Sequence, residues 1–168
     1  MMLRAGWLFV SVVAIAAAAG CQDGDGLVRG RPVSLDRIDR VNLWAEPMAI
    51  NWDRDPAPDG VNVRVYLYRL RGRDVQTATG RGEIELLLFE GADEAALRAE
   101  PFHTWRFTAS ELKPFLAHDA YGLWCHQMGL PWGDHVPTTA SVTMVARYID
   151  TGGSVVTSAP ASILVRAQ

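Results

Sequence analysis

The sequence predicts an all-β fold: an antiparallel immunoglobulin-like β-sandwich of seven to eight strands with one or two short helical insertions. Apolar and polar residues alternate over several short stretches, and clusters of Gly, Pro and Asp separate these stretches. No stretch after residue 21 is long enough, with helical periodicity, to predict a long helix. Many short strands joined by turns favour two packed antiparallel sheets. The Cys–Trp–Cys signature of antibody domains is absent, so the prediction concerns architecture alone.

The clearest predicted strand runs over residues 61–70. Its even-numbered positions from 62 to 68 carry polar or aromatic side chains, and its apolar face comprises Val61, Val63, Val65 and Leu67. A period of two over this length is typical of a strand with one buried face. The turn-rich run 56–60, which contains two prolines and ends in glycine, marks where it begins.

Weaker alternation predicts the remaining strands and two helical fragments. The other predicted strands are 41–44, 48–52, 82–90, 102–108, 122–127, 141–149 and 155–165. The last two flank the turn 150–153 and are expected to form a hairpin. Helical fragments are expected at 92–99 and after Thr108. For the second, a capping box of Thr108 with Glu111 competes with Ser110 as N-cap, and we favour Ser110 because it places Pro114 in the first turn.

The N-terminal segment predicts export and lipidation. Arg4 precedes an uncharged run of 16 residues, Ala5 to Gly20, which is shorter than the roughly 20 residues that a membrane-spanning helix needs. The small residues 18–20 before Cys21 resemble the bacterial lipobox, whose cysteine receives diacylglycerol and becomes the mature N-terminus. Ala18 stands where that motif usually has Leu. Residues 1–20 are therefore predicted to be a lipoprotein signal peptide and Cys21 the lipidation site. An ordinary cleaved signal peptide and an uncleaved short anchor stay open as alternatives.

The rest of the chain is predicted to form one tethered domain. Residues 21–38 are rich in Gly, Asp and Arg and are expected to be a flexible tether, and residues 39–168 the β-sandwich. The N-terminal lipid would attach the chain to a membrane in the cell envelope. Gln22 stands where an Asp would favour inner-membrane retention, so we expect the outer membrane, facing the periplasm.

Charge and cysteine content exclude several classes of protein. The formal net charge is −3, and removing residues 1–20 takes away one base and no acid, so a nucleic-acid partner is not expected. Cys125 would be the one free thiol of the mature chain, so its fold has to rest on a hydrophobic core rather than on an intramolecular disulfide. We expect no cofactor.

A cluster of potential metal ligands lies within residues 118–135. Its candidate ligands are His118, Cys125, His126, Met128 and His135, with Asp119 and Asp134 nearby. Imidazole and thiolate suit copper or zinc. The spacing matches no known zinc or blue-copper pattern, and Cys125 and His126 would point to opposite faces of a strand. We therefore favour a buried free thiol beside surface histidines over a metal site.

Two further kinds of site are weaker. The acidic loop of Asn51, Asp53, Asp55 and Asp59 does not match an EF-hand, because Ala57 and Pro58 stand where a ligand and a glycine belong, so turn chemistry is favoured. An enzyme is not expected, because no Gly-x-Ser-x-Gly motif occurs and a small sandwich is not expected to hold a deep pocket.

Tryptophans offer the last candidate site. Five follow Cys21, and most are expected in the core or at its rim: Trp44, Trp52, Trp105, Trp124 and Trp132. If Trp124 and Trp132 were exposed together, they would form a glycan- or protein-binding face.

Several blocks resemble a known family. Tyr121 to Val165, with Leu130-Pro-Trp-Gly-Asp134 and the closing Gly-Gly hairpin, looks like uncharacterised lipoproteins of planctomycete-type bacteria, as do Tyr66-Leu-Tyr and Leu86-Leu-Leu-Phe-Glu-Gly. These motifs are structural, so the resemblance implies no catalytic residue. The expected function is that of a lipid-anchored, non-catalytic scaffold or protein-binding module with an envelope protein as partner. The alternative is a metal- or glycan-binding envelope module centred on residues 118–135.

Overall fold

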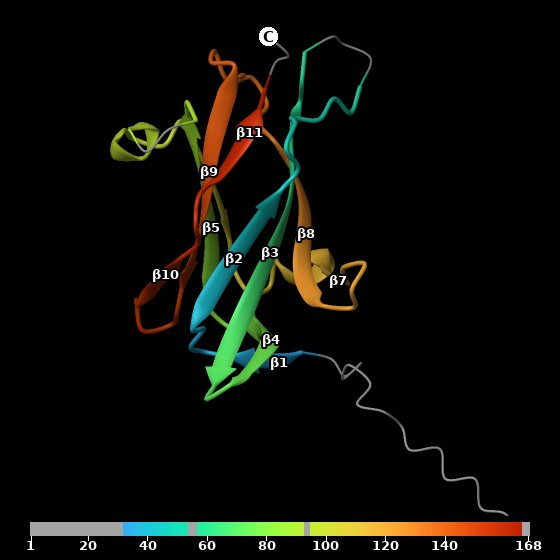
Figure 1. Cartoon of the computed structure of the whole chain (residues 1–168), viewed down its shortest axis with the longest axis vertical. Coiled ribbons are helices and arrows are strands. Elements are labelled where there is room, and N and C mark those ends of the chain that lie inside the picture. Colours follow the sequence, from blue (N-terminus) through green and yellow to red (C-terminus); the bar gives the residue numbers. More distant parts are fainter. Residues whose placement is uncertain (1–31, 54–56, 93–94, 166–168) are drawn as a thin grey trace, which may run out of the picture.

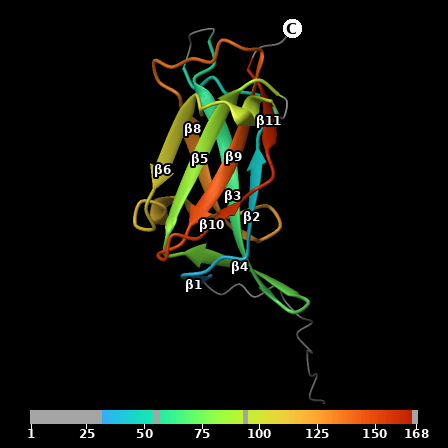
Figure 2. The ribbon, with the colours of Figure 1, turned by 90° about the vertical axis from the view of Figure 1, so that its left-hand side faces the viewer.

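The computed structural model describes residues 32–53, 57–92 and 95–165, and these form two β-sheets packed face to face (Figures 1 and 2). The predicted all-β class is confirmed. Sheet A contains β1 (Val33–Leu35), β2 (Arg40–Ala45), β3 (Gly60–Arg71), β4 (Asp74–Gly80), β7 (Leu116–His118) and β8 (Trp124–Pro131). Sheet B contains β5 (Glu83–Glu90), β6 (His103–Phe107), β9 (Ser141–Ile149), β10 (Val155–Thr157) and β11 (Ala161–Leu164). The two 3₁₀ turns are η1 (Ala96–Arg98) and η2 (Lys113–Phe115).

Strand β3 organises sheet A. Strand β2 pairs along one edge of β3, and the other edge pairs first with β8, over residues 60–65, and then with β4, over residues 67–71. Strand β1 runs parallel to β4, and β7 pairs antiparallel with β8. Because β3 changes partner along its length, sheet A curls instead of lying flat.

Strand β9 organises sheet B. Strand β5 pairs along one edge of β9, and β10 and β11 follow one another along the other edge. The predicted strand 155–165 is therefore two strands. The break falls at Ser158, whose hydroxyl accepts a hydrogen bond from the Ala146 amide, and at Pro160, which has no N–H for a sheet.

The core lies between the sheets and is built by strand alternation. In β3 the odd-numbered side chains from Val61 to Leu67 point inward, as predicted, and β9 contributes Val142, Met144, Ala146 and Tyr148. Burial of this apolar surface, at about 25 cal/mol of free energy per Å², is the main stabilising contribution in such a domain. Cys125, the one cysteine among the described residues, makes no disulfide.

Three sequence predictions about the elements need correction. The predicted strand 48–52 is reduced to two isolated bridges, Met48 with Leu164 and Ile50 with Gly60. The predicted tether is too long, because β1 pairs with β4 and Ile38 is only 2% exposed, so the domain begins at or before Val33. Residues 1–31, which include the predicted signal peptide and Cys21, lie outside the described residues.

The third difference from the prediction lies at the N-terminal cap of the segment 108–115. The Glu111 carboxylate accepts hydrogen bonds from the Thr108 amide and hydroxyl, both at 2.8 Å. This is the capping-box arrangement, so the choice of Ser110 as N-cap is wrong. Residue 112, not 110, directly precedes η2, and Pro114 still lies in the first turn of η2. The helical fragment expected at 92–99 is the short turn η1.

Candidate functional site

The predicted metal ligands do not come together. Cys125 faces the outer side of β8, whereas His126 and Met128 face the core, as alternation along a strand requires. His118 pairs with the start of β8, and His135 follows its end, roughly 25 Å away at about 3.3 Å per residue. Within the described part of the chain, no group of three or more His, Cys, Asp or Glu side chains is placed to hold a metal ion.

The predicted free thiol is buried, and His118 and His135 are exposed as expected, whereas His126 is not. Burial raises the pKa of the Cys125 thiol, and the Gln127 amide nitrogen lies 3.7 Å from its sulfur. His126, expected at the surface, is only 4% exposed. His118 is exposed and lies against the Trp124 ring, with 3.6 Å between ring centroids.

The tryptophan pair predicted as a binding face is not exposed together. Trp132 is 1% exposed and donates a hydrogen bond from Nε1 to the Pro58 carbonyl at 2.9 Å. Trp124 is partly buried at the opposite end of β8. A ligand therefore cannot contact both indoles. Trp132 belongs to the core because it continues the inward-facing alternation of Met128 and Leu130 one position beyond the end of β8.

The acidic loop shows the turn chemistry that the sequence predicts. The Asp59 carboxylate accepts hydrogen bonds from the Trp52 and Asp53 amides, and the Asn51 amide donates to the Ala57 carbonyl. Asp55 lies outside the described residues. Asp59 therefore fixes the conformation of the chain around Trp52.

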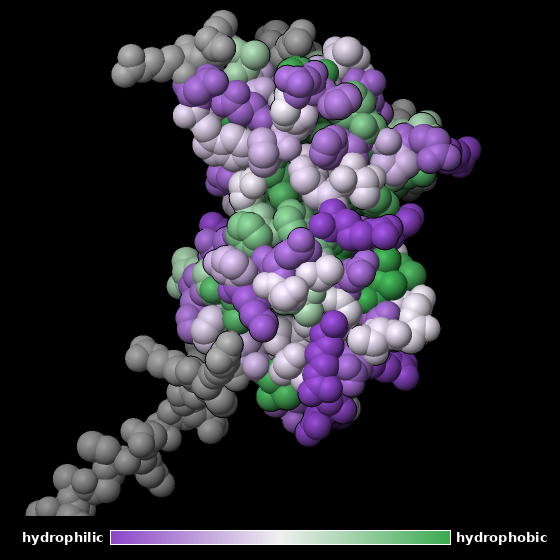
Figure 3. Space-filling view, turned by 180° about the vertical axis from the view of Figure 1, so that it is seen from behind, coloured by the Kyte–Doolittle hydropathy of each residue, from purple (hydrophilic) through white to green (hydrophobic). Residues whose placement is uncertain are grey.

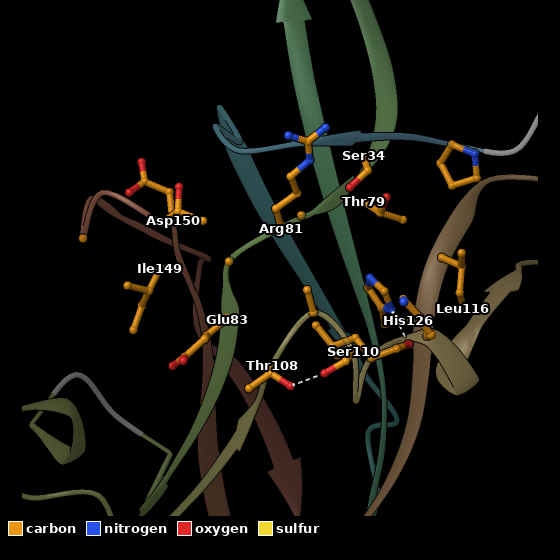
Figure 4. Close-up of a pocket in the computed structure, with 18 residues that line it drawn as sticks. Ser34, Thr79, Arg81, Glu83, Thr108, Ser110, Leu116, His126, Ile149 and Asp150 are labelled. Carbon is orange, nitrogen blue, oxygen red and sulfur yellow. Dashed lines mark hydrogen bonds between the residues drawn. The ribbon is translucent and has the colours of Figure 1, made fainter.

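A large hollow opens between the sheets at the end where β1 and β4 lie (Figure 4). Its volume is about 970 Å³, contrary to the expectation that so small a sandwich holds no sizeable pocket. The wall from sheet A includes Ser34 and Thr79, Arg81 follows directly after β4, and the segment 108–113 forms another side. Two charged side chains that line the hollow already form ion pairs, Arg81 with Asp36 and Glu83 with Arg106.

His126 is the buried polar group of this hollow. Its Nδ1 lies 3.2 Å from the Leu112 carbonyl oxygen, which can only accept, so Nδ1 carries the proton and Nε2 is left as an acceptor. Burial lowers the pKa of His126, so the ring is neutral. The Ser110 hydroxyl, a candidate nucleophile on the segment 108–113, bonds to the Thr108 hydroxyl (Figure 4). The hollow thus lacks the hydrogen-bonded nucleophile and base of acyl transfer among its described residues.

A second, smaller site lies on the outer face of sheet A, and we call it the sheet A groove. Its volume is about 230 Å³, and its lining side chains are those of Trp44, Glu46, Asn62, Arg64 and Gln127, beside Gly129. These residues come from three adjacent strands, because Trp44 pairs with Arg64 and Arg64 with Gln127. The Arg64 guanidinium lies over the Trp44 ring at 4.4 Å from its centroid, a cation–π contact.

Two glycines allow a second indole to lie at the edge of this groove. A Cβ at Gly129 would lie 3.1 Å from the Trp52 ring, and a Cβ at Gly60 would lie 2.7 Å from it. The Trp52 ring therefore rests directly on the backbone of β3 and β8. Trp52 is 47% exposed and Trp44 is 40% exposed. From the strand register, the Cα atoms of Trp44 and Gly129 are about 12 Å apart.

The sheet A groove was not predicted from the sequence, although one signal pointed to part of it. Val41 and Leu43 are inward-facing, so alternation alone places Asn42 and Trp44 outside. The position of Trp52 could not be found in this way, because it depends on glycines in two other strands. Large exposed side chains are also present elsewhere, and Figure 3 shows hydrophobic residues reaching the surface across the narrowed middle of the molecule seen from behind.

Comparison of this chain with family models, with curated proteins and with solved structures gives no match in any of the three. Among the described residues, no helix has the length and apolar character to cross a membrane.

Proposed function

We propose that this protein is a lipid-anchored, non-catalytic binding domain of the bacterial cell envelope, and that it binds through the outer face of sheet A. The observation that carries the proposal is the pair of half-exposed indoles, Trp44 and Trp52, at the sheet A groove. A large aromatic side chain left at the surface exposes apolar area that folding would normally bury, and such surfaces are typical of binding sites.

The non-catalytic part of this proposal is supported by how the reactive side chains are placed. Cys125 and His126 lie on opposite faces of β8, and the neutral His126 bonds to a backbone carbonyl. Catalysis by a thiol or hydroxyl requires a base within hydrogen-bond reach and a third group that orients the base.

The anchored part is supported by the sequence of residues 1–21 and by its resemblance to the lipobox. We further propose that the sandwich is of the immunoglobulin-like kind. In support, β2, β3, β8 and β7 pair in the order of strands A, B, E and D of that fold. Likewise β6, β5, β9 and β11 pair in the order C′, C, F and G.

The anchor is tested by fractionating cells that export either the wild-type chain or Cys21→Ser. We expect the wild type in the membrane fraction and the variant, folded, in the soluble fraction, because each buried methylene of the lipid contributes about 0.8 kcal/mol to membrane binding. Mass spectrometry of the mature N-terminus identifies the lipid. A Cys21→Ser chain that stays membrane-bound would contradict the anchor.

Binding is tested on envelopes whose membranes have been dissolved with detergent, so that the lipid no longer retains the protein. We expect the insoluble envelope material to retain the wild-type chain and to release the double variant Trp44→Ala, Trp52→Ala. Tyr121→Ala is the matched control, because Tyr121 is 80% exposed at the opposite end of sheet A. Equal release of the wild type and the double variant would show that this face does not bind.

A further inference from the structure

We infer that the sheet A groove binds a glycan, a chain of pyranose sugars, by stacking sugar rings on Trp44 and Trp52. This inference rests on the proposed function, because it names the ligand of the same face. The relevant feature is a polar floor with an indole at each of two corners: Trp44, which carries the Arg64 guanidinium on its ring, and Trp52, which rests on Gly129. By strand register, the Cα atoms of Trp44 and Gly129 are about 12 Å apart.

The two indoles match the apolar side of a sugar. A pyranose with equatorial hydroxyls presents its C–H bonds on the two faces of the ring, and these bonds are attracted to the negative face of an aromatic system. Trp52 lies on the backbone at Gly60 and Gly129, so one face of its ring is backed by the sheet and the other is available to a ligand.

The polar floor matches the hydroxyl edge of a sugar. Asn62, Arg64 and Glu46 each end in a planar group with two neighbouring donors or acceptors, whereas the Gln127 side-chain nitrogen already donates to the His118 carbonyl. Planar groups of this kind can bond two adjacent hydroxyls at once, as guanidinium does with carboxylate. The set contains both donors and acceptors, so it suits hydroxyls, which are both.

The same floor argues against a protein partner at this groove. The centre of a protein–protein interface is depleted in charged residues and enriched in apolar contact. Here the central strand, β3, contributes a charged and an amide side chain, Arg64 and Asn62, and Trp44 lies on the neighbouring strand β2.

The groove is also largely preformed. Arg64 lies over Trp44, and the Asp59 carboxylate bonds the Trp52 amide, so the indoles are positioned before a ligand arrives. Preformed sites lose less conformational entropy on binding. Strand β2 runs from the end of the sandwich where β1 and β4 lie towards its middle (Figure 1), and Trp44 is its penultimate residue.

The inference is tested with the full-length lipidated protein in a zwitterionic detergent that contains no sugar headgroup. The probes are hexasaccharides of β-1,4-linked glucose and of β-1,4-linked N-acetylglucosamine, and binding is followed by tryptophan fluorescence and calorimetry. We expect at least one probe to bind, with an affinity about tenfold or more lower for Trp44→Ala and for Trp52→Ala. The control Tyr121→Ala should bind as the wild type does.

A second variant guards against loss of folding. Asn62→Ala keeps both indoles and removes one planar polar group, so it should weaken binding while its thermal unfolding stays close to that of the wild type. Failure of the wild type to bind either probe at millimolar concentration, or unchanged binding by both tryptophan variants, would overturn the inference. If the envelope test still separates the wild type from the double variant, the glycan alone is wrong; if neither test separates them, the proposed function is wrong as well.

Discussion

The outer faces of the two sheets are built in opposite ways. Sheet B carries Leu87, Phe89 and Val145 on its outer face, and the chain around η1 covers them, adding Ala96 and Leu97 to a small second core. Sheet A carries Asn62, Arg64 and two half-exposed indoles, and no described segment covers the groove between them. Figure 2 shows η1 over the upper end of sheet B.

The two outer faces therefore differ in whether their apolar area is shielded from water. Apolar area on the outer face of sheet B is removed from water by the protein's own chain, which contributes to folding. The aromatic area on sheet A is supported by glycines and by an arginine but is left in contact with water. A face that keeps large aromatic groups exposed beside polar ones is the place to look for a ligand.

The largest expected effect comes from breaking the covered face. Phe89→Ala should lower the free energy of unfolding by about 3 kcal/mol, because it leaves a cavity under η1. Trp44→Ala should lower it by about 1 kcal/mol or less, since it removes an exposed cation–π contact. Urea denaturation of both variants measures the difference. Equal losses would mean that the covered face of sheet B contributes no more to stability than the exposed face of sheet A.

The inner and outer faces of sheet A each hold a buried titratable side chain, His126 on β8 and Tyr66 on β3. His126→Leu should cost about 2 kcal/mol at pH 7, because the Leu112 carbonyl loses its donor. The folded pKa of His126 lies below the unfolded value of about 6.5, so the unfolded state binds the proton first. Wild-type stability from this group is therefore complete above pH 6.5 and falls as the pH drops below it.

His126→Leu should lose this acid dependence in denaturation curves recorded between pH 7 and pH 5. His118→Gln, a change at the exposed end of β7, should retain it because His126 is still present. An acid dependence unchanged in His126→Leu would show that the buried ring does not stay neutral in the folded state.

Tyr66, on the outer face of the neighbouring strand β3, provides the alkaline counterpart. Burial, with a 3.0 Å hydrogen bond to Asp119, raises the pKa of Tyr66 to about 12. An unfolded tyrosine loses its proton near pH 10, so the unfolded state binds fewer protons between about pH 10 and pH 12, and wild-type stability falls as the pH rises through that window. Tyr66→Phe should cost about 1 kcal/mol at pH 7 and weaken this alkaline fall. Thermal unfolding as a function of pH tests both effects.

Sequence patterns predicted the strands with a strict period of two and failed where long-range contacts decide. Strands 61–70, 82–90 and 141–149 were predicted closely because one face of each is apolar. Strand β4 (Asp74–Gly80) was missed because it has few large apolar residues and is fixed by pairing with β3 and β1. The groove was missed for the same reason, since Trp52 is placed by glycines in other strands.

Two local sequence signals compete at the start of the segment 108–115, the Thr108–Glu111 capping box and Ser110 as N-cap. The change in the free energy of unfolding that distinguishes them is small. The segment forms one side of the hollow between the sheets, and the Thr108–Glu111 hydrogen bonds fix its start. Thr108→Ala should cost about 1 kcal/mol, because it removes the hydroxyl that bonds Glu111. Ser110→Ala should cost clearly less, since its hydroxyl bonds only the Thr108 side chain among the described residues. If urea denaturation instead shows the larger loss for Ser110→Ala, the serine and not the capping box holds this segment in place, and the position of Pro114 would be the better guide after all.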